Sequence, residues 1–280
     1  MPLNEDRVRN YAFPSPRFEV TEKDAMLYAL GLGIGSDPLD PRQLRHVYEQ
    51  DLVVFPTMPV VLGSPGLWFA DAGLDFRKLV HGSQTLQMER PVPLGAQLVS
   101  RSKVVGLYDK GADKGAVVDV ERVIASDDGT VVSRLVSTYV LRGDGGFGGE
   151  APPRDGWTRP ERAPEADIVL PTLPQAALIY RLSGDMNPLH ADPERAKAVG
   201  FPRPILHGLC TFGMMGRAVI EAFSPDDPGA LKSISGRFTR PVYPSDTLSV
   251  SLWKDDAGIL FEARTDADTV VFTGGRATAR

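Results

Sequence analysis

The residues best suited to chemistry lie between positions 180 and 213. A carboxylate, Asp185, and an imidazole, His190, stand five positions apart and flank the dipeptide Asn187-Pro188. A proline there favours an irregular loop, and polar side chains on a loop can converge on a ligand. A carboxylate and an imidazole that share one water can take its proton and return a proton to carbon. The spacing therefore indicates acid–base chemistry on a small molecule.

Purely structural roles for these residues remain open from the residue types alone. Asp185 could close a turn by bonding to its own backbone, and His190 could be a half-buried imidazole with an internal partner. Asp192 has a stronger structural role, because Asp192-Pro193 is typical of a helix N-cap followed by proline in the first turn. We therefore predict a cap at Asp192 and acid–base work at Asp185 and His190.

A second chemical feature is His207-Gly208, which stands at the start of the apolar run 208–223. Such a run, apolar nearly all round, predicts a buried helix. Free N–H groups and partial positive charge at a helix N-terminus suit an oxygen that gains negative charge in a transition state. A glycine lets a ligand approach the backbone closely, although Gly208 could equally serve tight packing of the helix on a sheet.

Other kinds of site have less support. His190, Asp192 and His207 lack the spacing of a metal site, and Cys210 in the apolar run is typical of a small buried hydrophobe rather than a nucleophile. No Gly-x-Gly-x-x-Gly or phosphate-binding loop follows a predicted strand. We therefore expect no metal and no cofactor.

The composition argues against several classes of protein. The chain has 280 residues with 31 Lys and Arg against 36 Asp and Glu, a net charge of −5, and lacks the basic clusters of a nucleic-acid-binding protein. The most apolar window, 52–62, is short and broken by Pro56 and Pro59, so no membrane span is expected. A charged N-terminus and the single Cys210 indicate a reducing compartment, the cytoplasm.

The elements that must position the chemical residues occur twice. Arg90-Pro91-Val92 returns as Arg240-Pro241-Val242 at an offset of 150, and Tyr28-Ala29-Leu30 returns as Tyr180-Arg181-Leu182 at an offset of 152. Matches in the same order at similar offsets indicate a duplicated unit.

Each half is predicted to run from helix to antiparallel strands, an α+β unit, and two such units could pair edge to edge in one continuous sheet. The segment 150–167 contains four prolines and eight charged residues, so we predict an extended, exposed linker between the halves 1–149 and 168–280. Helices are predicted over 25–32, 174–182 and 208–223, and strands over 85–90, 97–107, 116–124, 130–141, 232–240, 247–253, 259–264 and 269–273.

The segment around Asp185 also resembles a known family. It reads Tyr180-Arg181-x-Ser183-Gly184-Asp185-x-Asn187-Pro188-Leu189-His190-x-Asp192-Pro193 and continues with Pro204-Ile205-Leu206-His207-Gly208-Leu209. This run resembles the hydratase 2 motif of MaoC-like (R)-specific enoyl-CoA hydratases. In the first half, Leu79-Val80-His81-Gly82, Asp109-Lys110-Gly111 and the glycine-rich run 142–149 are similar to the two-unit, eukaryotic-type members. The resemblance implies a double hotdog, in which each of two repeats has a central helix wrapped by an antiparallel sheet.

The resemblance also implies a reaction and a set of site residues. The reaction is the reversible hydration of trans-2-enoyl-CoA to (3R)-hydroxyacyl-CoA, with coenzyme A as part of the substrate. Asp185 and His190 would be the acid–base pair, the N–H of Gly208 the oxyanion donor, and Asn187 a substrate-placing residue. The remaining contacts to the acyl-CoA would come from Ser183, Gly184 and Phe238 in the second half and from His81, Gly82 and Lys110 in the first.

The two halves are not expected to share the chemistry. At the offset of 152, Asp185 corresponds to Gly33 and His190 to Pro38, and neither of these residues can move a proton. We therefore predict one active site per chain, with a non-catalytic first half that shapes the acyl tunnel and contacts the coenzyme A.

Two other functions remain open. Hotdog units also host acyl-CoA and acyl-carrier-protein thioesterases, but these usually work with one carboxylate and without an Asp-x-x-x-x-His pair. A non-enzymatic acyl-binding protein would be expected to lack the pair altogether. The sequence also leaves a homodimer open.

Overall fold

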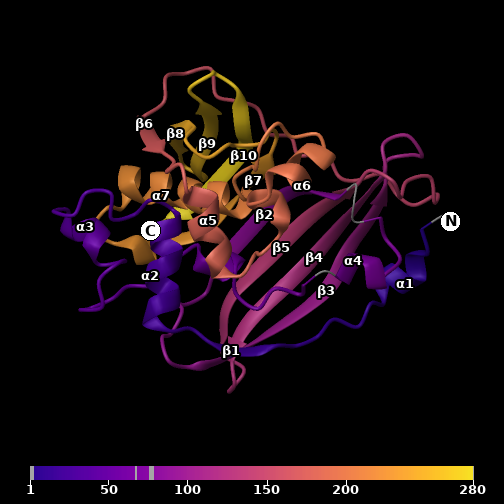
Figure 1. The fold of residues 1–280 in the computed structure, drawn as a ribbon, viewed down its shortest axis with the longest axis horizontal. Helices are drawn as coiled ribbons and strands as arrows, with labels where there is room; N and C mark the ends of the chain where they lie inside the picture. The colour runs from indigo at the N-terminus through magenta and orange to yellow at the C-terminus, as the bar shows by residue number, and fades with distance from the viewer. Residues whose placement is uncertain (1–2, 67, 76–78, 280) are drawn as a thin grey trace.

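One continuous sheet runs through both halves of the chain. The computed structural model describes residues 3–66, 68–75 and 79–279, and within them the strands form a ten-stranded antiparallel sheet (Figure 1). Its order is β1-β3-β4-β5-β2-β7-β10-β9-β8-β6. The first-half strands are β1 Arg17–Glu19, β2 Leu79–Met88, β3 Gln97–Asp109, β4 Ala116–Ser126 and β5 Val131–Leu141; the second-half strands are β6 Ala166–Pro171, β7 Leu231–Phe238, β8 Thr247–Asp255, β9 Gly258–Thr265 and β10 Val270–Ala279.

The strand order confirms the duplication. Read outward from the centre, β2-β5-β4-β3-β1 is matched by β7-β10-β9-β8-β6, so the same five-stranded unit occurs twice. The halves join where β2 pairs with β7, from Ser83 opposite Arg237 to Gln87 opposite Ser233. This seam hides two strand edges that would otherwise be open to unwanted pairing. The α+β class and the edge-to-edge pairing predicted from the sequence are both confirmed.

Details of the loops repeat as well. The rings of Tyr28 and Tyr180, which share the offset of 152, meet with centroids 5.9 Å apart. Asp40 accepts a hydrogen bond from Arg42 N at 2.9 Å, and Asp192, 152 positions later, accepts one from Glu194 N at 2.9 Å. Both aspartates therefore cap a short helix that begins with proline, as the sequence predicted for Asp192.

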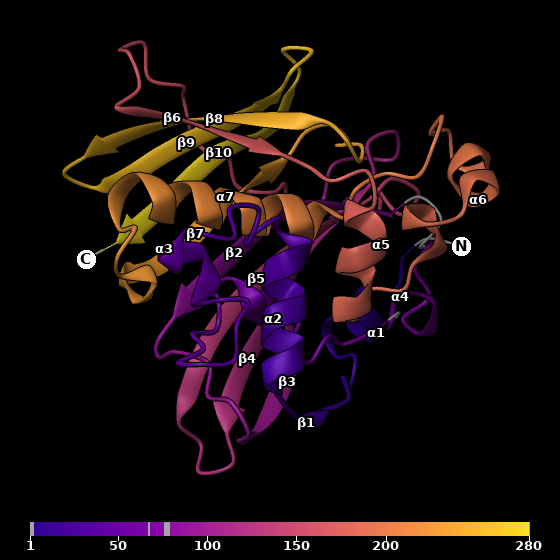
Figure 2. The same cartoon turned by 60° about the vertical axis from the view of Figure 1, so that its left-hand side comes forward.

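The helices are unequal in the two halves. α7 (Gly208–Phe223) is buried over most of its length and packs on strands of both halves, mainly on β6 and β7 and also on β2, β8 and β10. Figure 2 shows it lying beneath the second-half strands, with α2 and α5 side by side. The first half fills the equivalent space with short pieces. The remaining helices are α1 Glu5–Arg9, α2 Glu22–Gly31, α3 Pro41–Leu44, η1 Met58–Val60, α4 Trp68–Asp71, α5 Ala176–Tyr180, η3 Arg181–Ser183, η4 Pro188–His190, α6 Pro193–Ala198 and η5 Pro228–Ala230.

The segment between the halves is less free than its composition suggests. It has no helix or strand before β6 begins at Ala166, yet Asp155 forms ion pairs with Arg237 on β7 at 3.2 Å and with Arg276 on β10 at 3.0 Å. The indole N–H of Trp253 donates to the main-chain oxygen of Arg162 at 2.9 Å. Most residues of the segment are exposed and none is buried, as expected, but its charges find partners on the second-half sheet. The boundaries 1–149, 150–167 and 168–280 stay a prediction.

Among the described residues, every helix is too short or too polar to cross a membrane.

Candidate active site

The loop that carries Asp185 is built by short-range hydrogen bonds. Gly184 ends η3 with a φ of 121°, a conformation that glycine adopts without strain. One carboxylate oxygen of Asp185 then accepts from Asn187 N at 3.1 Å, and the Asn187 side chain caps η4 by accepting from Leu189 N at 3.0 Å. Asp185 therefore closes a turn, which is the structural role that the sequence left open for it, but it does so with only one carboxylate oxygen. Its second oxygen has no hydrogen-bond partner among the described residues.

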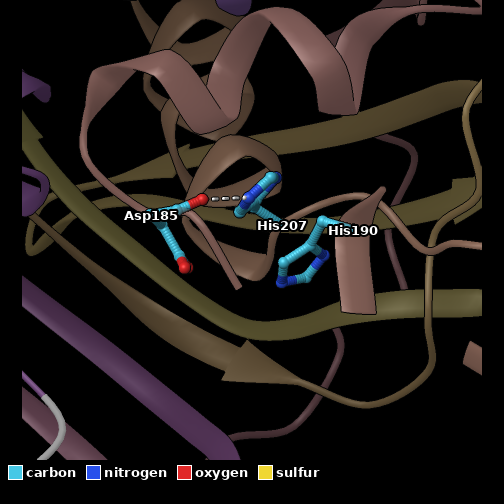
Figure 3. A group of neighbouring side chains, drawn as sticks. All are labelled: Asp185, His190 and His207. Carbon is cyan, nitrogen blue, oxygen red and sulfur yellow. Dashed lines mark hydrogen bonds between the residues drawn. The ribbon is translucent and has the colours of Figure 1, made fainter. Parts of the chain in front are cut away.

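Three side chains converge beyond this turn. Ligand-capable atoms of Asp185, His190 and His207 all lie within 4.8 Å of one another (Figure 3). Nδ1–H of His190 donates to the main-chain oxygen of Ile205 at 2.8 Å, so its Nε2 carries the free lone pair. Burial lowers the pKa of His190 below its ordinary value of 6.5, which keeps the ring neutral at neutral pH. The arrangement provides a carboxylate oxygen and a basic nitrogen for one shared water.

Gly208 supplies a hydrogen-bond donor beside this pair. It is the first residue of α7, and within the described part of the chain its N–H donates to no protein group. A Cβ built on Gly208 would lie 3.5 Å from the ring of Phe238, so this ring covers one side of Gly208. The donor lies near the pair, because Gly208 directly follows His207, which contacts both Asp185 and His190.

The first half reaches the same place across the β2–β7 seam. The ring of His81 on β2 lies 5.1 Å from that of Phe238 and 5.0 Å from that of Tyr139 on β5. Gly82 follows at a break in the β2–β5 register, a bulge that redirects the neighbouring side chain. Burial lowers the pKa of His81 to about 4, against the attraction of the Asp185 carboxylate. Nε2 of His81 is buried without a partner among the described residues.

Lys110 lies apart from these residues. It is exposed at the turn between β3 and β4. In the sheet order β3-β4-β5-β2, the end of β3 lies about three strand spacings, roughly 14 Å, from β2. The turn is fixed by Asp109, whose carboxylate accepts from Gly111 N, Gly146 N and Gly148 N at 2.7, 2.8 and 2.7 Å. Lys110 can therefore contact only a remote part of a long substrate.

The structure thus brings together Asp185, His190, Gly208, His81 and Phe238. Asn187 caps η4, Ser183 has a buried hydroxyl without a partner among the described residues, and neither is shown to touch a substrate. Sequence reasoning missed two residues that the structure places in or beside the site, the imidazole of His207 and Tyr139.

The cluster does not fit a metal ion. The rings of His190 and His207 are stacked, with centroids 3.7 Å apart and planes inclined by 25°. Imidazole binds a metal through a lone pair in the plane of the ring. Nearly parallel planes do not meet at one point close to both nitrogens. The expectation of no metal and no cofactor stays a prediction.

Comparisons with known proteins agree with this fold and site. Residues 18–143 match the family model described as MFE-2 hydratase 2 N-terminal domain, and residues 157–274 match that described as MaoC like domain. The chain is 38% identical to enoyl-CoA hydratase ChsH3 of Mycobacterium tuberculosis over 98% of each chain. A crystal structure of a MaoC-like dehydratase from Phytophthora capsici is similar with a TM-score of 0.86 and 32% identity over 99% of each chain. A Mycobacterium tuberculosis protein that is 14% identical, described as having a double hotdog fold, shares the fold with a TM-score of 0.56 over 95% of this chain and 93% of that one.

The class of fold follows from these findings: the chain is a double hotdog of the α+β class. The chain belongs to the MaoC-like hydratase 2 family, in the form that has two hotdog units, and it is an enzyme of the hydro-lyase class.

Proposed function

We propose that the chain adds water reversibly to a trans-2-enoyl-CoA and forms a (3R)-3-hydroxyacyl-CoA. The observation that carries the proposal is the cluster of Asp185, His190 and His207, whose ligand-capable atoms lie within 4.8 Å of one another, with Gly208 directly after His207 at the start of α7. The names of the relatives, which describe enoyl-CoA hydration, support it.

The reaction begins at the thioester carbonyl. A hydrogen bond from Gly208 N–H to the carbonyl oxygen draws electron density from the conjugated double bond and makes C3 electrophilic. The partial positive charge at the N-terminus of the 16-residue helix α7 favours the enolate oxygen that develops when C3 is attacked.

Asp185 and His190 handle the water. They hold one molecule between the free carboxylate oxygen and Nε2, and its oxygen adds to C3 as the pair removes its proton. The pair returns one proton to C2. The hydroxyl of one water is then on C3 and a hydrogen is on C2, and Asp185 and His190 return to their starting protonation states. Dehydration is the same path in reverse.

The direct test is an assay of the purified chain with trans-2-enoyl-CoA of several acyl lengths. Loss of the enoyl absorbance, with a product oxidised by a (3R)-specific but not by a (3S)-specific dehydrogenase, is the expected result. Release of free CoA from saturated acyl-CoA would instead indicate a thioesterase. Tight binding without turnover would indicate an acyl-binding protein, and either outcome would overturn the proposal.

The pH dependence follows from His190. Its neutral form is the one that accepts a proton, and burial holds its pKa below 6.5. We expect kcat/KM to be constant above about pH 6.5 and to fall only at lower pH, as His190 takes up a proton. Circular dichroism at each pH separates this titration from acid unfolding. An acid limb with its midpoint above 6.5 would contradict the assignment.

Lys110 is proposed to contact a phosphate of the coenzyme A. Lys110→Ala should raise KM several-fold, leave kcat nearly unchanged and make KM less sensitive to salt. Lys103→Ala is the matched control, because Lys103 is exposed on β3, the strand that Lys110 directly follows, but pairs with Glu121 at 3.0 Å. Equal KM values for the two variants would rule out the role of Lys110.

The first half is proposed to bind but not to catalyse. Gly33 and Pro38 replace the pair. Gly63 ends Pro59-Val60-Val61-Leu62-Gly63 as Gly208 ends Pro204-Ile205-Leu206-His207-Gly208, at an offset of 145. It follows the short η1 and has the side chain of Ser100 packed against it, and among the described residues no long helix starts there. Titration of the chain with a non-reactive acyl-CoA analogue should give one bound ligand per chain. Two equivalent sites would contradict the proposal.

A homodimer in the cytoplasm completes the proposal. The buried, unpaired Cys210 suits a reducing compartment. Leu178 and Leu182, one helical turn apart, are 52% and 57% exposed and provide an apolar face that a second copy would cover. Light scattering on the purified chain distinguishes a dimer from a monomer.

A further inference from the structure

His207 contacts both members of the acid–base pair. Its Nε2–H donates to the main-chain oxygen of Asp185 at 3.1 Å, as the dashed line in Figure 3 shows. Its ring lies stacked on that of His190, with centroids 3.7 Å apart. Its own peptide bond carries the N–H of Gly208. One residue therefore touches all three groups on which the proposed reaction depends.

Helix capping does not explain this histidine. It is the N-cap residue of α7, where a side chain usually accepts a hydrogen bond from the first turn, and the His207 side chain makes no such bond to the described residues. Serine or aspartate would serve a cap better. The imidazole is turned instead toward the loop that carries Asp185.

Packing alone does not explain it either. His207 is 1% exposed, and its Nδ1 is buried without a hydrogen-bond partner among the described residues. Burying a polar atom in this way is unfavourable, and a leucine or phenylalanine would fill the space without that cost. The imidazole must therefore contribute something that an apolar side chain cannot, and its bond to Asp185 is that contribution.

The ring nitrogens of His207 are not placed for proton transfer, because Nε2–H is bonded to the main chain of Asp185 and Nδ1 is buried. Burial and the neighbouring His190 ring lower the pKa of His207 to about 4, so it is neutral at neutral pH. Nε2 holds the ring's one proton, because only a donor can bond to the carbonyl of Asp185. In this tautomer His207 holds the Asp185 main chain by a hydrogen bond and does not act as an acid.

We propose that His207 is a positioning residue that holds Asp185 and His190 against the oxyanion donor at Gly208. The proposal rests on the proposed hydration. Asp185 is exposed and follows Gly184 in a loop, so its main chain needs an anchor from outside. His207 provides that anchor by donating a hydrogen bond to the main-chain carbonyl of Asp185, and its stacked ring restricts the orientation of the His190 ring. Small displacements of catalytic groups can cost about 10²-fold in rate.

Two substitutions separate the hydrogen bond from the ring. His207→Phe keeps a ring that can stack on His190 but removes the donor. His207→Gln removes the ring but carries an amide N–H that can reach the position of Nε2–H. We expect kcat to fall about 100-fold in His207→Phe and less than about 10-fold in His207→Gln, with KM within about threefold of the unchanged chain in both.

Two further readouts do not depend on turnover. Hydrogen exchange of the amides in 181–190 should accelerate in His207→Phe and stay slow in His207→Gln. Calorimetric affinity for a saturated acyl-CoA should stay within about threefold, which shows that the pocket is intact. If the unchanged chain hydrates enoyl-CoA and His207→Phe retains its kcat, the positioning role is overturned. A chain that binds acyl-CoA without hydrating it would overturn the proposed function instead, and the exchange experiment would still decide whether His207 anchors the loop.

Discussion

Asp185→Asn and His190→Ala are each expected to lower kcat for hydration by about 10³-fold, with the fold retained. General acid–base catalysis contributes roughly 10²- to 10⁴-fold, and removing one member of a cooperating pair loses most of the rate. The asparagine at position 185 can still accept the bond from Asn187 N that closes the turn, so the loop should keep its shape. Loss of the ring at His190 removes its bond to Ile205 but leaves η4 capped by Asn187.

Asp192→Asn provides the matched control. Asp192 lies on the same segment but caps α6 through Glu194 N and Arg195 N, and asparagine is an equally good cap. It should retain kcat within about twofold. Initial rates from the enoyl absorbance, with circular dichroism spectra of all variants, test these expectations. Turnover near that of the unchanged chain in a folded Asp185→Asn or His190→Ala variant would remove the proposed mechanism.

The parts of the site that could be predicted are those set by local sequence. Asn187-Pro188 fixes an irregular loop, and the change to an apolar run at Gly208 fixes a helix start, so Asp185, His190 and Gly208 were placed on the correct elements. Asp192 was recognised as a cap for the same reason. Each of these features depends on neighbours within a few positions, which is the range over which capping and proline rules act.

Two prolines in the first half have a structural consequence that becomes clear only when the two halves are compared in the structure. Its apolar window 52–62 contains Pro56 and Pro59, and proline cannot continue a helix interior. The structure accordingly forms only the short η1 there, where the second half has α7. The family fold is retained, but among the described residues the centre of the first half is filled by short elements, and the long helix whose N-terminus lies beside Asp185 and His190 belongs to the second half.

The remaining contacts could not be predicted because they join distant parts of the chain. Asp109 binds the amides of Gly146 and Gly148, which lie 37 and 39 positions further along the chain. Asp155 pairs with Arg237 and Arg276 once the sheet has formed. The composition shows that these residues are charged, but it does not show which distant residues will become their partners in the folded chain.

Gly208→Pro is expected to lower kcat by about 10²- to 10³-fold, because proline has no N–H to donate to the thioester oxygen. That range is typical for loss of one oxyanion donor. The position tolerates proline structurally: Gly208 is the first residue of α7, where proline is favoured, and its missing N–H leaves no helix bond unmade. The preceding residue, His207, has φ −61° and ψ 135°, the extended conformation that a following proline requires.

Gly208→Ala separates the loss of the N–H from the addition of side-chain atoms. Its Cβ would lie 3.5 Å from the ring of Phe238, an ordinary contact distance, and its N–H is retained. We expect Gly208→Ala to change KM more than kcat, and Gly208→Pro to lose kcat at unchanged affinity for a saturated acyl-CoA. Steady-state rates and calorimetry of the two variants measure both quantities. Equal losses of kcat in the two would mean that crowding at Phe238, and not the N–H, limits the reaction, and the electrophilic activation would then have to come from another donor.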